Sequence, residues 1–169
     1  SLVGSEMCIR DSDQTVHYAE TGIQVMPINT LFQLYSMKQN DDVQLRVADK
    51  LLFMPDLFSY FLTGVANNEY CIASTSELLD ARQRNWSDNL ISELGLPRQL
   101  FGEIVFPGTV RGKLKQEIAD ETGLGCINVV AVGSHDTASA VFAVPSNEPN
   151  RAYLSSGTWL SLIHISEPT

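Results

Sequence analysis

Apolar residues recur at helical spacing in the first half of the chain and predict three consecutive amphipathic helices. They are expected over residues 30–40, 41–52 and 55–63. The second should begin behind Asp41 as its N-cap, and the third should end at Gly64 in a left-handed turn. The expected core-facing stripes are Leu31, Leu34 and Tyr35 in the first helix, Val43, Val47 and Leu51 in the second, widened by Leu45, Ala48 and Leu52, and Leu57, Phe58, Phe61 and Leu62 in the third.

Strands and helices alternate in the second half of the chain, which predicts an α/β or α+β fold. Residues 69–74 fit either a strand or an extended loop. Ser87 is expected to cap a short helix that Gly95 ends. Downstream, the pattern predicts a strand over residues 109–114, a helix ending at residue 122, a buried strand over 126–132, a packed helix over 138–144 and a strand over 151–154.

Two short polar segments each follow a predicted strand. The first is residues 133–137, with the sequence GSHDT, and a predicted helix comes directly after it. The second is residues 155–158, with the sequence SSGT. Open α/β sheets bind ligands beyond the carboxyl ends of their strands, so these two segments are the candidate site.

Asp136 admits two interpretations. A carboxylate at the start of a helix is most often a plain N-cap, but it can also accept a proton from a substrate hydroxyl. His135 and Thr137 on either side could donate hydrogen bonds to the hydroxyls of a sugar. A single histidine beside an aspartate lacks the paired spacing of a metal site, so we expect no metal ligand here.

The second polar segment is suited to phosphate. Gly157 lets backbone N–H groups approach phosphate oxygens closely, and the hydroxyl of Thr158 can donate to them. Turns rich in serine and glycine are usually only turns. The indication therefore comes from the combination of this segment with residues 133–137.

Composition restricts the classes of function. With 169 residues, 44% of them hydrophobic, the chain has the content of about one domain. Twenty acidic residues against 11 basic ones give a net charge of -9, which opposes the basic surface that nucleic acid requires. The same charge is compatible with ATP, because Mg²⁺ and a few backbone N–H groups neutralise a triphosphate locally.

Membrane insertion and export are not predicted. No uncharged apolar stretch approaches the roughly 20 residues that cross a bilayer, and no secretory signal is recognisable. The three cysteines, Cys8, Cys71 and Cys126, have the spacing of neither a zinc site nor a disulfide framework. A reducing cytoplasm is therefore the expected location.

The two polar segments and their neighbours, GSHDTASAVFAVP and RAYLSSGTW, resemble the corresponding segments of the FGGY carbohydrate kinases. Upstream, TGIQVMPINTLFQLY, LLFMPDLFSYFLTG and CIASTSELLDARQRNW resemble the same family in the same order. The resemblance covers residues 13–159. It implies an α/β fold of two ribonuclease-H-like, actin-type ATPase domains with ATP and sugar in the cleft between them. Residues 13–148 would be the C-terminal part of the first domain, which is incomplete here, and residues 149–159 the first strand of the second.

The resemblance also implies roles for individual residues. The aspartate of the family's His-Asp-Thr motif is the general base, which makes Asp136 the expected catalytic residue. His135, Asp136 and Thr137 would contact the sugar. Gly157 and Thr158, which match the family's Ser-Gly-Thr-Trp motif, would contact ATP.

The implied activity is transfer of the γ-phosphoryl group of ATP, with Mg²⁺, to a ketose. The motif His-Asp-Thr-Ala-Ser-Ala favours L-rhamnulose as the ketose, with its 1-hydroxyl as the phosphoryl acceptor. The fragment alone should be inactive, because the family's first phosphate-binding hairpin and later second-domain residues are missing. The alternatives are another FGGY kinase, acting on xylulose, fuculose or glycerol, and a non-catalytic sugar-binding module of the same fold.

The two ends of the chain, residues 1–12 and 160–169, show no periodicity continuous with their neighbours. They resemble translated sequencing-adapter bases, so we expect two non-native tails rather than ordinary frayed termini. Reading the coding nucleotides across Ser12/Asp13 and Trp159/Leu160 should reveal a junction at each point. Uninterrupted genomic sequence at those points would contradict this expectation.

Overall fold

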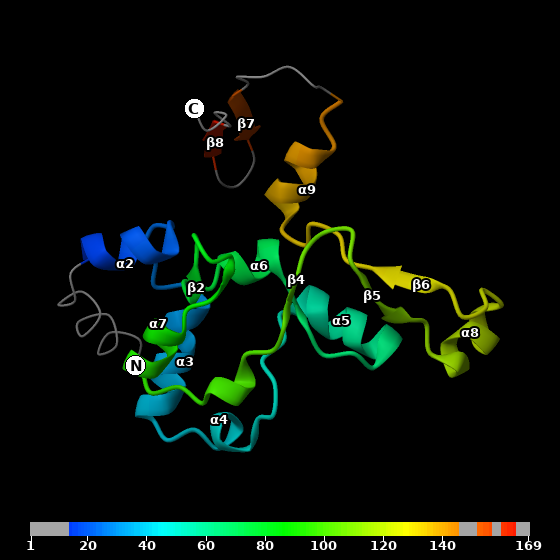
Figure 1. The fold of residues 1–169 in the computed structure, drawn as a ribbon, viewed down its shortest axis with the longest axis horizontal. Helices are drawn as coiled ribbons and strands as arrows, with labels where there is room; N and C mark the ends of the chain where they lie inside the picture. The colour runs from blue at the N-terminus through cyan, green and yellow to red at the C-terminus, as the bar shows by residue number, and fades with distance from the viewer. Residues whose placement is uncertain (1–13, 146–151, 157–159, 165–169) are drawn as a thin grey trace.

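The computed structural model describes residues 14–145, 152–156 and 160–164, and it mixes helices with strands as the pattern predicts (Figure 1). The helices are α2 (Gln14–Thr21), α3 (Thr30–Gln39), α4 (Val43–Val47), α5 (Met54–Thr63), α6 (Tyr70–Ser74), α7 (Asp88–Glu93), the 3-10 helix η1 (Arg98–Leu100), α8 (Gln116–Thr122) and α9 (Asp136–Phe142). The strands are β1 (Asn68–Glu69), β2 (Leu79–Asp80), β3 (Asn85–Trp86), β4 (Ile104–Val105), β5 (Val110–Lys113), β6 (Asn128–Val130), β7 (Ala152–Ser156) and β8 (Leu160–His164). None of the described helices is long and apolar enough to cross a membrane.

The described strands form four two-stranded sheets. β1 and β4 run parallel, with Asn68 opposite Ile104 and Glu69 opposite Val105. The pairs β2–β3, β5–β6 and β7–β8 are antiparallel. Since α6 begins directly after β1, the strand delivers Glu69 to the N-terminus of that helix.

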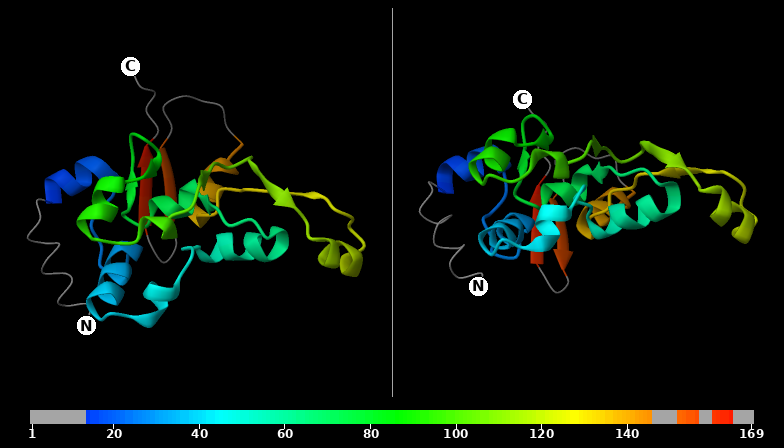
Figure 2. Two further views of the ribbon diagram at one scale, coloured as in Figure 1. Left: turned by 60° about the horizontal axis from the view of Figure 1, so that its bottom comes forward. Right: turned by 90° about the horizontal axis from the view of Figure 1, so that it is seen from below.

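The elements from α2 to β6 form two parts, which we call the helical lobe and the arm. The helical lobe contains α2, α3, α4, α7 and the β2–β3 pair, and the arm contains α5, the β5–β6 ribbon and α8. Figures 1 and 2 show the ribbon and α8 extending away from the lobe, with α5 alongside. α6 lies between the two parts, close to the segment that leads into α9.

The hydrophobic core lies in the helical lobe and extends to α6. Trp86 and Phe101 pack edge to face with their ring centroids 5.0 Å apart, and the indole N–H of Trp86 donates to the carbonyl of Gly102 at 2.7 Å. The predicted core positions Leu31 and Leu34 of α3 are buried. The buried cluster consists of Leu31, Phe32, Leu34, Leu45, Ala73, Leu78, Leu79, Trp86, Ile91, Leu96, Leu100 and Phe101.

Several predicted helix ends are confirmed, and each has a local cause. α5 stops at Gly64, whose φ of 77° is left-handed. Ser87 caps α7 by accepting a hydrogen bond from the N–H of Leu90 at 3.0 Å. α8 stops at Gly123, with φ 72°. Glycine and hydroxyl caps act over a few residues, so the sequence alone predicts them.

The second predicted helix differs from its expectation in extent, and only the widening residue Leu45 of its predicted stripe is buried in α4. α4 ends at Val47, and Asp42 rather than Asp41 caps it, since the Asp42 carboxylate accepts the N–H two residues on at 2.9 Å. Leu45 is buried, whereas Val43 and Val47 are 59% and 75% exposed. A helix of five residues can bury only one or two side chains, and in α4 the buried residue is Leu45.

The predicted buried face of α5 is wrong. Phe58 and Phe61 are 61% and 53% exposed, while Asp56 on another side is fully buried. Periodicity identifies which side chains share a face, but burial requires a second element to cover it. In the described residues β5 packs on the Asp56 side of α5 instead.

Three further expectations need correction. The strand predicted over residues 126–132 shortens to β6 and is not buried, with Val130 47% exposed. α9 forms as predicted but is not packed, and Phe142 is 94% exposed. Residues 69–74, expected to be a strand or loop, end β1 and form α6.

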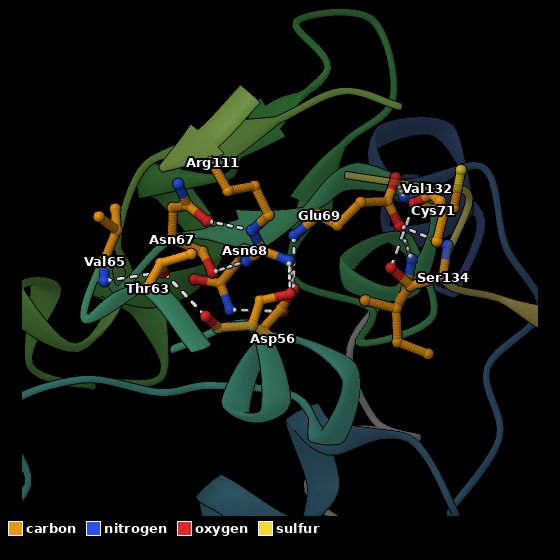
Figure 3. A network of polar contacts seen from close by, with 12 residues as sticks. Asp56, Thr63, Val65, Asn67, Asn68, Glu69, Cys71, Arg111, Val132 and Ser134 are labelled. Carbon is orange, nitrogen blue, oxygen red and sulfur yellow. Dashed lines mark hydrogen bonds and ion pairs between the residues drawn. The ribbon is translucent and has the colours of Figure 1, made fainter. Parts of the chain in front are cut away.

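A buried ion pair joins α5 to β5 (Figure 3). The Asp56 carboxylate lies 2.9 Å from Nη1 of Arg111, and both side chains are almost completely buried. Arg111 also donates from Nε to Asn67 Oδ1 at 2.7 Å, and Asp56 accepts from the amide of Asn68 and the backbone N–H of Glu69. The network therefore ties the arm to β1.

Burial raises the pKa of the Asp56 carboxyl above its usual range, and hydrogen bonds from Glu69 N–H and from Arg111 offset part of that rise. Desolvation thus opposes the charged form even with a cation beside it. Such a pair adds little net stability compared with apolar residues, but removing one member leaves a buried charge unpaired.

We expect Asp56→Ala to lower the free energy of unfolding by about 3–5 kcal/mol, because Arg111 would keep its charge without a partner. Urea unfolding followed by circular dichroism measures the loss. Asp42→Ala, which removes an exposed helix cap, is the control and should cost about 1 kcal/mol. The double variant Asp56→Ala/Arg111→Met should lose less than Asp56→Ala alone. Equal losses for the Asp56 and Asp42 variants would contradict this account.

Candidate functional site

The predicted strand, turn and helix around Asp136 are present. β6 leads through residues 131–135 into α9, whose first residue is Asp136 and whose N-cap is His135. The His135 side chain makes no capping hydrogen bond. Asp136 Oδ1 instead accepts from the N–H of the next residue, Thr137, at 2.7 Å, and lies 3.3 Å from His135 Nδ1.

This geometry argues against one of the two interpretations of Asp136, that of a plain N-cap. An N-cap carboxylate accepts from the N–H two or three residues ahead and stands just before the helix. Asp136 is already inside α9, and its side chain is 95% exposed. The plain-cap interpretation is therefore wrong, and the carboxylate is accessible to a ligand.

Asp136 and His135 line an open pocket with a volume of about 530 Å³. That volume is in the range of small-molecule sites. The lining combines apolar side chains with hydroxyl, amide, imidazole and carboxylate groups, as binding a polyol requires. The lining residues are Met26, Ile28, Asn29, Thr30, Ile72, Thr75, His135 and Asp136.

One wall of the pocket, residues 26–30, is held by the buried carboxylate of Glu77. Its Oε1 accepts from the N–H of Met26 at 2.9 Å and from the side-chain amide of Asn29 at 2.7 Å. Glu77 is fully buried and has a left-handed φ of 63°. Asn29, at the N-cap position of α3, makes no side-chain capping hydrogen bond, and its amide nitrogen donates to Glu77.

A second wall of the pocket, at Ile72 and Thr75, is held by Glu69, which is also fully buried. Its carboxylate accepts from the N–H groups of Cys71 at 2.8 Å and Ile72 at 3.3 Å, in the first turn of α6. It also accepts from the N–H of Ser134 at 3.0 Å. Figure 3 shows the Glu69 side chain extending from β1 towards Ser134.

Local contacts stabilise the turn further. The hydroxyl of Ser139 donates to the carbonyl of Gly133, and the hydroxyl of Ser134 donates to the carbonyl of Val132 at 3.3 Å. A Cβ on Gly133 would stand 3.8 Å from the sulfur of Cys71, so the turn lies in contact distance of α6.

The predicted site residues are thus partly brought together. His135 and Asp136 line the pocket, and Thr137 contacts Asp136 without lining it. Gly157 and Thr158 lie outside the described residues. No group of three potential metal ligands occurs among the residues that the structure describes.

Sequence reasoning missed Glu69 and Glu77. Glutamate is not a favoured N-cap residue and seldom lies buried, so neither position carries a local signal. Their partners, Ser134 and Met26, are 65 and 51 residues away along the chain.

Comparison with known proteins identifies relatives over most of the chain. A family model described as the N-terminal domain of the FGGY family of carbohydrate kinases matches residues 5–143. A rhamnulokinase of Bacteroides thetaiotaomicron is 52% identical over 84% of this chain and 29% of that protein. One from Oceanobacillus iheyensis is 41% identical over 88% of this chain and 31% of that protein. The chain therefore spans less than a third of the length of these relatives.

Solved structures of sugar kinases share the fold. A xylulose kinase from Rhodospirillum rubrum superposes with a TM-score of 0.78 at 18% identity, over 89% of this chain and 31% of that chain. A carbohydrate kinase from Novosphingobium aromaticivorans gives 0.75 at 29% identity, over 90% and 34%. The predicted α/β, ribonuclease-H-like fold class, incomplete in this chain, is confirmed. The exact domain boundaries stay predictions, and the family match includes residues 5–12 of the expected tail.

The thiol of Cys71, beside Glu69, should react slowly with alkylating reagents. Burial, followed by the hydrogen bond and the charge of Glu69, raises the pKa of Cys71 to about 11. At a pH of about 8 only roughly one molecule in a thousand would carry the reactive thiolate. We expect alkylation by iodoacetamide, resolved by mass spectrometry, to be much slower at Cys71 than at the exposed Cys126.

Glu69→Gln should speed the reaction of Cys71 and leave that of Cys126 unchanged, because it removes the neighbouring negative charge. Equal rates at the two cysteines in the unmodified chain would contradict the described surroundings of Cys71.

Proposed function

The chain belongs to the FGGY family of carbohydrate kinases, and we propose that the full-length protein transfers the γ-phosphoryl group of ATP to the 1-hydroxyl of L-rhamnulose. Relatives named rhamnulokinase, 41% and 52% identical, support this choice of sugar. The location is proposed to be the cytoplasm, where ATP is available.

The observation that carries the proposal is the exposed carboxylate of Asp136 at the pocket. A general base must reach the proton that it removes, and it must not be committed to a structural role. The Asp136 carboxylate is open to solvent and is not a helix cap. The non-catalytic alternative gives no reason for such a carboxylate to face a pocket of this size.

In the proposed reaction Asp136 accepts the proton of the sugar's 1-hydroxyl as that oxygen attacks the γ-phosphorus of ATP. The new bond joins the sugar oxygen to phosphorus, and the bond between phosphorus and the β–γ bridging oxygen breaks, so that ADP leaves. His135 and Thr137 are proposed to orient the sugar through hydrogen bonds. Gly157 and Thr158 are proposed to contact ATP, whose bound Mg²⁺ offsets charge on the phosphates.

The alternative within the family is a kinase for xylulose, fuculose or glycerol. The chain shares its fold with a xylulose kinase, but at 18% identity that likeness carries no information on the sugar. Assaying the full-length protein with L-rhamnulose, xylulose, fuculose and glycerol separates these cases. A clear preference for one of the other three would replace the proposed substrate.

In the full-length protein, Asp136→Asn should lower kcat by roughly 10² to 10⁴-fold with an unchanged fold, because the amide cannot accept the proton. A coupled assay of ADP release measures turnover. Asp120→Asn, at an exposed carboxylate of α8, is the matched control and should keep full activity. The isolated 169-residue chain should show no turnover. Near-normal turnover of Asp136→Asn would rule out the assigned base.

A further inference from the structure

We propose that Glu69 is a positioning residue that holds the turn carrying His135 and Asp136 against α6. The inference rests on the proposed function, because it gives Asp136 its working position. Glu69 does not line the pocket, so it acts through the turn and not on the substrate.

The first argument is the chemistry of the buried carboxylate. Glu69 is fully buried, and the described ion pairs do not include it. Its charge is instead compensated by three backbone N–H groups, of Cys71, Ile72 and Ser134. Hydrogen bonds to an ionised acceptor are among the stronger ones in proteins, and a buried carboxylate that loses a donor becomes costly. The contact with Ser134 is therefore held firmly.

The second argument is the position of the three donors. Two of them belong to α6, which contributes Ile72 to the pocket, as does the C-cap residue Thr75 that follows it. The third belongs to Ser134, which directly precedes His135 and Asp136. One carboxylate thus sets the distance between the two parts of the pocket that carry these side chains.

The third argument is the lack of other long-range support for the turn. In the described part of the chain, and apart from the hydrogen bonds inside α9, the remaining hydrogen bonds of residues 132–137 are local and end within residues 132–139. α9 has no buried residue, and Val132 is 65% exposed. Packing of α9 and of Val132 therefore does little to hold the turn. Ala131, just before it, is fixed by hydrogen bonds with Gly108 and Thr109, both at 2.8 Å. Beyond that point, the Ser134 contact is the long-range hydrogen bond described for residues 132–137.

The base of the Glu69 side chain is itself anchored. Its backbone N–H donates to Asp56 Oδ1 at 3.0 Å, and Asp56 pairs with Arg111 at 2.9 Å. Figure 3 shows these residues in a continuous chain from β5 to the turn at Ser134. The carboxylate therefore extends from a point of β1 that Asp56 and Arg111 fix to the arm.

A role as a mere cap of α6 predicts something different. Aspartate is a better N-cap than glutamate and would keep the contacts with the first turn of α6. It is one methylene shorter, so it could not also reach the N–H of Ser134. Glu69→Asp therefore separates helix capping from positioning of the turn.

The test uses Glu69→Asp in the full-length enzyme. We expect kcat for the sugar to fall by about 10 to 100-fold, the cost of displacing a reacting group by roughly an ångström. KM for ATP should stay near its normal value, and the melting temperature should fall, because the buried carboxylate loses one of its donors. Ser87→Ala, which removes the cap of α7 and does not change the pocket lining, is the control and should lower the melting temperature without lowering kcat.

Two further measurements exclude a purely structural effect. In the Asp136→Asn background, Glu69→Asp should cause no additional loss of kcat, because the residue through which Glu69 acts is already inactive. Hydrogen exchange of the full-length protein should become faster in the peptide covering residues 132–138 in Glu69→Asp and stay unchanged in Ser87→Ala.

The outcomes separate this inference from the proposed function. A full-length protein that phosphorylates none of the four sugars overturns both. An active enzyme in which Glu69→Asp keeps normal kcat and normal exchange at residues 132–138 overturns the role of Glu69 alone. A loss that adds fully to that of Asp136→Asn also overturns it.

Discussion

Burial of carboxylates without loss of their hydrogen bonds is the constraint on which this structure depends. A carboxylate removed from water is tolerated only where N–H groups or a cation replace the lost hydration. Asp56 meets this requirement with Arg111 and the N–H of Glu69, and Glu69 meets it with three backbone N–H groups. Because these donors come from β5, α6 and the turn before α9, satisfying two acids determines how the arm and the pocket meet.

The arm and α9 leave large apolar side chains in contact with solvent. Phe58, Phe61 and Phe142 are each more than half exposed. Residues of this type are usually buried in a complete domain. Their exposure agrees with an incomplete ribonuclease-H-like domain, in a chain that covers less than a third of the rhamnulokinases that it matches.

The fold of this chain is shared by proteins that have little of its sequence. A xylulose kinase of 18% identity shares the fold, and rhamnulokinases share far more of the sequence. The pocket walls at residues 26–30 and around α6 contain side chains that line the pocket together with Asp136. Each wall is held by a buried glutamate, Glu77 or Glu69, so the positions of the lining groups depend on residues outside the pocket.

The sequence by itself determined the local features of this protein: the stop at Gly64, the cap at Ser87, and the strand, turn and helix that present Asp136. These depend on backbone chemistry within a few residues, and the family motif adds the expected role of Asp136. Only the tertiary structure decided that the apolar side of α5 is exposed and that Asp56 and Glu69 are buried. Burial of an acid depends on hydrogen-bond donors that lie 55 or 65 residues away along the chain. A pattern of neighbouring residues cannot predict such partners.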